Sequence, residues 1–117
     1  MKYLTIPEDI VLGKDQEGKD VKGSFFQWLD GNPLNDEKFG KSAANLRMSV
    51  SIAKRVEGKA PGEVVPLEDK EWEILNEAIE TPSSGYRTVF AKLFIPFMDA
   101  VKDASGDNPV RSGETRE

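Results

Sequence analysis

The apolar spacing between residues 39 and 56 constrains the fold of this 117-residue chain more than any other feature. Separations of four and three residues alternate along Phe39, Ala43, Leu46, Val50 and Ala53. This is the spacing of one face of a packed α-helix, and Met48, Ile52 and Val56 widen the apolar stripe. We expect the helix to be capped by Asn35 or Asp36. We expect it to end at Gly58, because Pro61 and Gly62 follow and favour a break.

The N-terminal part predicts β structure followed by a short helix. Residues 9–22 combine two β-branched segments with a turn over residues 14–19, which indicates a hairpin. Residues 2–6 have the composition of a third strand. Ser24 and Gln27 have the spacing of a capping box, so a short aromatic helix should begin there.

The C-terminal half predicts a strand and two helices. Residues 63–67 suit a short strand at a sheet edge or an extended connector, because the proline within them cannot donate a hydrogen bond to a neighbouring strand. Helices are expected from about residue 68 to 80 and from about residue 86 to 104. Pro96 lies inside the second helix and should kink or break it. Residues 105–117 are polar and rich in glycine and serine, which predicts a disordered tail.

These elements predict an α+β fold, predominantly helical, with a small N-terminal β-hairpin packed on three to four helices. A single domain should span residues 1–104. The expected core residues are Ile10, Leu12, Phe26, Leu29, Leu46, Val50, Trp72, Leu75, Phe90, Leu93 and Phe97.

The composition argues against most catalytic chemistry. The chain has no cysteine and no histidine, so it lacks thiol nucleophiles and the commonest general base and metal ligand. A near match to a P-loop ends with Asp20 where Ser or Thr would bind Mg²⁺. A calcium loop counted from Asp15 would place Phe26 where a bidentate Glu is needed. We therefore expect no enzyme activity, no cofactor and no metal site. With no signal peptide or membrane span evident, a cytoplasmic location is expected by default.

Charge is distributed unevenly along the chain. The net charge is −5 overall, but residues 38–59 sum to +5 and residues 60–80 sum to −6. Three interpretations remain open: two solvated faces, a protein interface built on charge complementarity, or nucleic-acid contact by the basic helix. The candidate partner-binding residues are Lys41, Arg47, Lys54 and Arg55 on the basic face and Glu71, Glu73 and Glu77 on the acidic face.

The leading functional hypothesis is a non-enzymatic protein-interaction module that binds another protein or itself. A nucleic-acid-associated regulator is the first alternative, although the acidic average charge makes nucleic acid an unfavourable partner. An inhibitor that mimics nucleic acid with its acidic face is the second. No membrane partner is expected.

Three short segments carry a resemblance to a group of proteins. They are residues 61–69 (PGEVVPLED), 80–86 (ETPSSGY) and 94–101 (FIPFMDAV). Together they resemble small accessory proteins encoded by tailed bacteriophages and prophages, over roughly residues 36–103. The resemblance implies a role through protein contacts, either in virion or tail assembly or on a host protein. It implies no catalytic residues.

Overall fold

The computed structural model describes residues 1–107 and has an α+β, predominantly helical fold, as the sequence predicts. The strands are β1 (Lys2–Thr5), β2 (Ile10–Lys14), β3 (Asp20–Gly23) and β4 (Val64–Leu67). The α-helices are α1 (Phe25–Gly31), α2 (Ala43–Val56), α3 (Asp69–Glu80), α4 (Thr88–Ala91) and α5 (Ile95–Lys102). Three 3₁₀ turns are η1 (Pro33–Asn35), η2 (Glu37–Gly40) and η3 (Lys92–Phe94).

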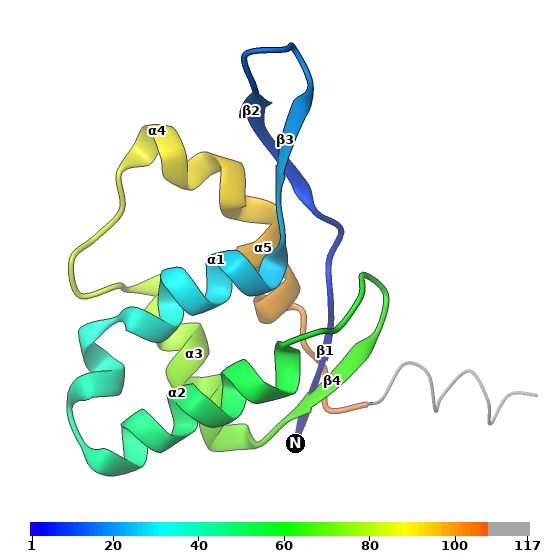
Figure 1. Cartoon of the computed structure of the whole chain (residues 1–117). Helices are drawn as coiled ribbons and strands as arrows, with labels where there is room; N and C mark the ends of the chain where they lie inside the picture. Colours follow the sequence, from blue (N-terminus) through cyan, green and yellow to red (C-terminus); the bar gives the residue numbers. More distant parts are fainter. Residues whose placement is uncertain (108–117) are drawn as a thin grey trace, which may run out of the picture.

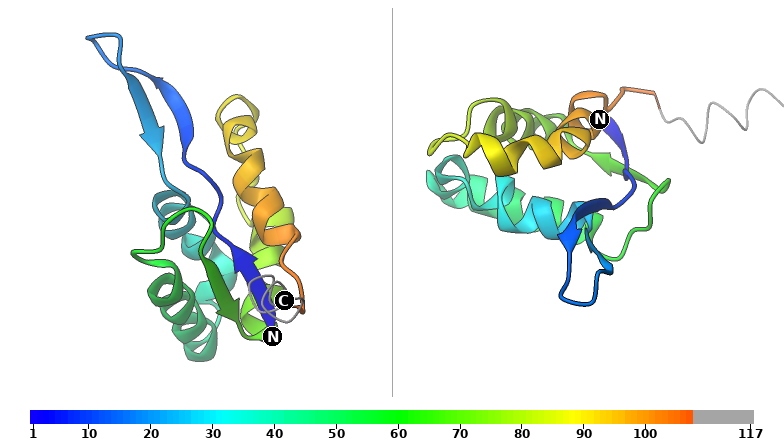
Figure 2. Two further views of the ribbon diagram at one scale, coloured as in Figure 1. Left: turned by 90° about the vertical axis from the view of Figure 1, so that its right-hand side faces the viewer. Right: turned by 90° about the horizontal axis from the view of Figure 1, so that it is seen from above.

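The helices form two layers, with α1 and α2 in one and α3, α4 and α5 in the other (Figure 2). Strands β1 and β4 pair antiparallel at one end of these layers, with Lys2 opposite Leu67 and Thr5 opposite Val64. Leu4 and Val65 are buried in this small sheet. The strand predicted at residues 63–67 is therefore confirmed, and it contributes directly to the hydrophobic core.

Strands β2 and β3 form the predicted hairpin, which projects beyond the helices (Figure 1). Its turn is held by the Asp15 carboxylate, which accepts hydrogen bonds from the backbone N–H groups of Glu17 and Lys19, both at 2.9 Å. Gly18 has a φ of +82°, which favours glycine. Most side chains of the hairpin are exposed. The strands that contribute fully buried side chains to the core are thus β1 and β4, while the hairpin contacts the rest of the molecule at its base, where β2 lies against η3.

An aromatic cluster joins α1 to the last helix. The Ser24 hydroxyl caps α1 by accepting from the N–H of Gln27 at 3.2 Å, as the capping-box spacing predicts. This cap directs Phe25 and Trp28 into the core. The ring of Phe97 lies 5.5 Å from that of Phe25, edge to face, and 5.7 Å from that of Trp28. Such pairs each contribute about 1 kcal/mol beyond area burial, so the cluster ties α5 to α1.

Helix α2 begins later than the sequence predicts. Asp36 caps the 3₁₀ turn η2 instead, and Ser42 caps α2 by accepting from the N–H of Asn45 at 3.1 Å. Gly40 ends η2, and glycine costs about 1 kcal/mol in a helix interior relative to alanine, which favours a break there. Within the predicted apolar stripe of α2, Ile52 and Val56 are buried whereas Leu46 and Val50 are exposed, so the inner face lies toward one edge of that stripe.

The predicted core is only partly correct. Leu29, Leu75 and Phe97 are buried, and Ile10, Phe26 and Trp72 are partly buried. Five predicted core residues are exposed: Leu12, Leu46, Val50, Phe90 and Leu93. The core instead takes side chains from β1, β4 and η1 that the helical pattern does not include. These five exposed apolar residues fall on two surfaces described below.

The predicted final helix is divided in three. Helix α4 ends at Ala91, η3 follows, and α5 starts at Ile95 with Pro96 in its first turn. The break at Pro96 is confirmed, since proline is accommodated where the helix has no hydrogen bond to lose. The predicted tail begins with Ser105, which instead forms two backbone hydrogen bonds with Tyr3. The remainder of the predicted tail, residues 108–117, lies outside the described residues.

Candidate protein-interaction surface

The outer face of α2 carries apolar and basic side chains side by side. Leu46 and Val50 lie one turn apart and are each 53% exposed. Arg47 and Lys54 are exposed beside them, and together with Val50, Ser51 and Arg55 they line a shallow groove. We call Leu46, Arg47, Val50 and Lys54 the α2 surface. A helix face packed on the core would not leave two apolar side chains of this size half exposed.

Arg55 and Glu71 bind each other across the contact between α2 and α3. The Nε atom of Arg55 lies 3.3 Å from Oε1 of Glu71, and Glu71 is 4% exposed. The Arg55 guanidinium also donates to the Pro66 carbonyl at 3.3 Å. Glu71 accepts from the N–H of Glu68 at 2.8 Å and so completes the capping box of α3. These two predicted partner-binding residues therefore hold the helices together, and Glu71 is closed to a partner.

The remaining predicted residues are accessible. Lys41 is exposed just before the N-terminus of α2, outside any helix. Glu73 and Glu77 are exposed one turn apart on α3, and we call them the acidic pair. The structure thus brings Arg47 and Lys54 together on one helix and the acidic pair on its neighbour. Both sets remain free for a protein contact.

A second apolar surface lies at the end of the molecule where the hairpin projects. Phe90 and Val89 on α4 are 62% and 80% exposed, and Leu93 of η3 is exposed beside them. Leu12 is exposed on β2, which lies against η3. The sequence pattern places three of these residues in the core, and it gives no signal that they would be exposed. The missing information is tertiary: within residues 1–107, no segment covers Val89 and Phe90 of α4.

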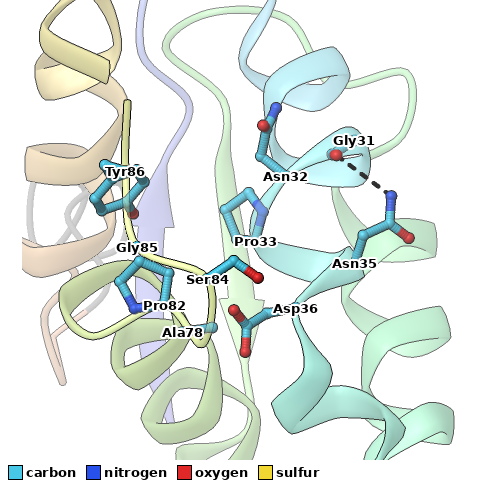
Figure 3. A pocket seen from close by; sticks show the side chains of 10 residues that line it. All are labelled: Gly31, Asn32, Pro33, Asn35, Asp36, Ala78, Pro82, Ser84, Gly85 and Tyr86. Carbon is cyan, nitrogen blue, oxygen red and sulfur yellow. Dashed lines mark hydrogen bonds between the residues drawn. The ribbon is translucent and has the colours of Figure 1, made fainter. Parts of the chain in front are cut away.

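A small pocket between η1 and the loop after α3 is lined by prolines, amides and the Asp36 carboxylate (Figure 3). The side chain of Asp36 is 8% exposed. Its two oxygens accept from the backbone N–H and the hydroxyl of Ser83, both at 2.8 Å, and from the N–H of Lys38 at 3.0 Å. The sequence gives no signal for this long-range contact between residues 47 positions apart.

The Asp36 carboxylate serves as a structural tie rather than as an acid or base. Burial by itself raises the pKa of Asp36, but hydrogen bonds from Lys38 and Ser83 outweigh it and hold the pKa below its usual value. A general base works best with a pKa near the operating pH, so this shift is in the wrong direction. In the same pocket, Tyr86 donates its hydroxyl to the Ile79 carbonyl at 2.6 Å. Burial raises the pKa of Tyr86, and the charges of Glu80 and Asp36 raise it further.

Within residues 1–107, no cluster of three or more acidic side chains is placed to hold a metal ion. None of the helices in this part of the chain is long and apolar enough to cross a membrane. The chain is thus a small α+β protein with a basic and apolar helix face and an exposed apolar end. No protein-family model, curated protein or solved structure matches it.

Proposed function

We propose that this chain is a non-enzymatic protein-interaction module that binds its partner through the α2 surface. The observation that carries the proposal is the exposure of Leu46 and Val50 beside the basic residues Arg47 and Lys54. Covering the exposed part of each apolar side chain, roughly 80 Å², would contribute about 2 kcal/mol. A few such anchors among charged residues are typical of protein-binding surfaces.

The charges of the α2 surface define the partner's chemistry. Arg47 and Lys54 favour acidic side chains, and the apolar pair favours leucine-like or aromatic ones. An acidic amphipathic helix offers both at the spacing of one turn, and helices commonly bind grooves in this way. Arginine in particular pairs with carboxylates in a two-pronged geometry, which adds specificity.

The resemblance to small phage accessory proteins supports a biological role for this contact in a phage. We place the module in virion or tail assembly, or in contact with a host protein during infection. Both roles need a compact binding surface and no catalysis. The partner would then be a phage structural protein or a host protein with an exposed acidic segment.

Two alternative functions use the same charged residues. A nucleic-acid-associated regulator would contact phosphates through Arg47 and Lys54, and its binding would weaken steeply as salt is raised. An inhibitor that mimics nucleic acid would present the acidic pair, Glu73 and Glu77, to a basic protein. The apolar side chains of the α2 surface favour the protein-interaction module over both, because phosphate contact does not need them.

A capture experiment with matched variants tests the proposal. Tagged wild-type protein is compared with R47E/K54E, with L46S/V50S and with a control, K59E/K102E, which changes the net charge equally at two exposed sites outside the α2 surface. A partner should bind the wild type and the control and be lost from both α2 variants. A parallel titration with duplex DNA at low salt should show no binding. A partner retained by both α2 variants would contradict the proposal.

A further inference from the structure

The hairpin and the helix α4 project from the same end of the molecule (Figures 1 and 2). Both elements carry exposed apolar side chains. At their base, β2 lies against η3, so the two projections adjoin there. The exposed apolar residues of this surface, which we call the apolar end, are Val11, Leu12, Val21, Val89, Phe90, Leu93 and Ile95.

Helix α4 does not bury its apolar side chains against the rest of the molecule. A hollow separates α4 from α1, lined by Trp28, Tyr86, Phe90, Phe94 and Met98 among others. Phe94 reaches across by stacking on Trp28, with ring centroids 6.0 Å apart. The next aromatic residue toward the N-terminus, Phe90, lines the hollow and yet remains more than half exposed. Residues 1–107 therefore leave Val89 and Phe90 of α4 largely uncovered.

Most side chains of the hairpin are likewise exposed. An isolated two-stranded hairpin is at best marginally stable in water. Within residues 1–107, neither β2 nor β3 pairs with a further strand. Val11 and Val21 are exposed on these strands, although β-branched side chains stabilise a strand mainly by packing against neighbours. The hairpin would gain stability from a surface that covers these side chains.

The size of the apolar end matches an interface between proteins. Its seven side chains expose roughly 600 Å², given typical areas for residues of these types. The largest apolar patch on a monomer is about 300–600 Å². A specific interface buries about 800 Å² on each partner. The apolar end, together with the backbone and polar rim around it, therefore approaches the area that a stable dimer needs.

The charges near the apolar end favour a second copy over other occupants. Arg87 and Lys92 are the only charged residues from position 81 to position 98. The cores of homodimer interfaces are depleted of charge in the same way, whereas a partner steered by charge would need more. The hairpin carries Lys14, Lys19 and Lys22 against Asp15, Glu17 and Asp20, so its net charge is zero and would not steer a partner of one sign.

We propose that the apolar end binds the same surface of a second copy of this chain, giving a two-fold symmetric dimer. In such a dimer each projection packs against its partner copy, and the hairpin and α4 are covered together. The α2 surface lies on another helix and takes no part in this contact. Each dimer would therefore present two α2 surfaces, which strengthens binding to any partner that displays repeated acidic segments.

Analytical ultracentrifugation of the full chain, from about 1 μM to on the order of 1 mM, tests the dimer. The wild type should sediment as a dimer toward the upper concentrations. V89K/F90E should weaken the dimer by about 100-fold or more. V11K/V21E should do the same from the hairpin side, which guards against misfolding of one variant. The matched control, L46K/V50E, places equal charges on the α2 surface and should leave the dimer intact.

Circular dichroism confirms that each variant is folded, and the folded variants decide the outcome. A wild type that stays monomeric at every concentration would overturn the proposal. So would a dimer that survives both V89K/F90E and V11K/V21E, or one that L46K/V50E abolishes. Flotation with vesicles of phosphatidylcholine and phosphatidylserine tests whether the apolar end binds a membrane surface. Monomers that bind these vesicles through Phe90 would assign the apolar end to a membrane surface instead.

Discussion

Replacing Glu71 with alanine should destabilise the fold, because its carboxylate has two structural roles. It accepts a hydrogen bond from the N–H of Glu68 at 2.8 Å, and it lies 3.3 Å from the Nε atom of Arg55. Removing it takes away part of a helix cap, which costs about 1 kcal/mol. It also leaves the Arg55 guanidinium without the carboxylate that neutralises its charge. Breaking a buried pair costs about 3–5 kcal/mol, but the Arg55 side chain is 32% exposed and water can solvate part of it.

These contributions give an expected loss of about 3 kcal/mol for Glu71→Ala. For a domain of this size the loss corresponds to a fall in Tm of roughly 12 °C. Glu73→Ala is the matched control, since Glu73 is exposed two positions along the same helix, and its cost should stay within about 0.5 kcal/mol. Urea denaturation and thermal melts followed by circular dichroism measure both variants.

The pair can be tested separately from the cap with a double-mutant cycle of Arg55→Met and Glu71→Gln. The coupling energy between the two residues should be about 1 kcal/mol or more, because neither variant alone can keep the ion pair. If Glu71→Ala and Glu73→Ala lowered stability equally, Glu71 would not be the structural residue described here. A coupling energy near zero would separately refute the role of Arg55.

Three further predictions concern other parts of the fold. Phe97→Ala should cost about 4 kcal/mol of unfolding free energy because Phe97 is fully buried, whereas Phe90→Ala should cost less than about 1 kcal/mol; similar costs in denaturation curves would contradict the aromatic cluster. The lowered pKa of Asp36 stabilises the fold above its usual pKa of about 3.8, and this stability is lost as pH falls through the depressed value. Asp36→Asn should therefore flatten the stability profile below about pH 4 in acid titrations, and an unchanged profile would argue against the tie to Ser83. Ser42→Ala should cost about 1 kcal/mol by removing the cap of α2, and a neutral effect in urea melts would mean that α2 does not begin there.

Local signals in the sequence predicted the local features of the fold. The capping box of Ser24 and Gln27, the turn of the hairpin and the break at Pro96 each depend on residues close together in the chain. Sequence also predicted the opposite charges of the helices over residues 43–56 and 69–80. Neighbouring residues alone determine these features, so one sequence suffices to predict them.

Features that depend on distant residues could not be predicted in this way. The hydrogen bonds between Asp36 and Ser83 join segments with no local pattern in common. The spacing of Leu46 and Val50 is that of a buried helix face, yet the core is filled from β1 and β4 and leaves both residues exposed. Conflicts between local pattern and final structure often mark functional sites. The exposure of Leu46 and Val50 on the α2 surface is such a conflict, and the proposed function depends on it.

Site-specific photo-crosslinking in a bacterial host tests the α2 surface most directly. A photoreactive amino acid is placed at Leu46, at Val50 and, as a control, at the exposed Lys102 of α5. The positions on α2 should crosslink to one discrete protein that the control position does not reach, and R47E/K54E should abolish the crosslink. Crosslinks that are absent from α2, or equally strong at Lys102, would contradict the assignment of α2 as the binding surface.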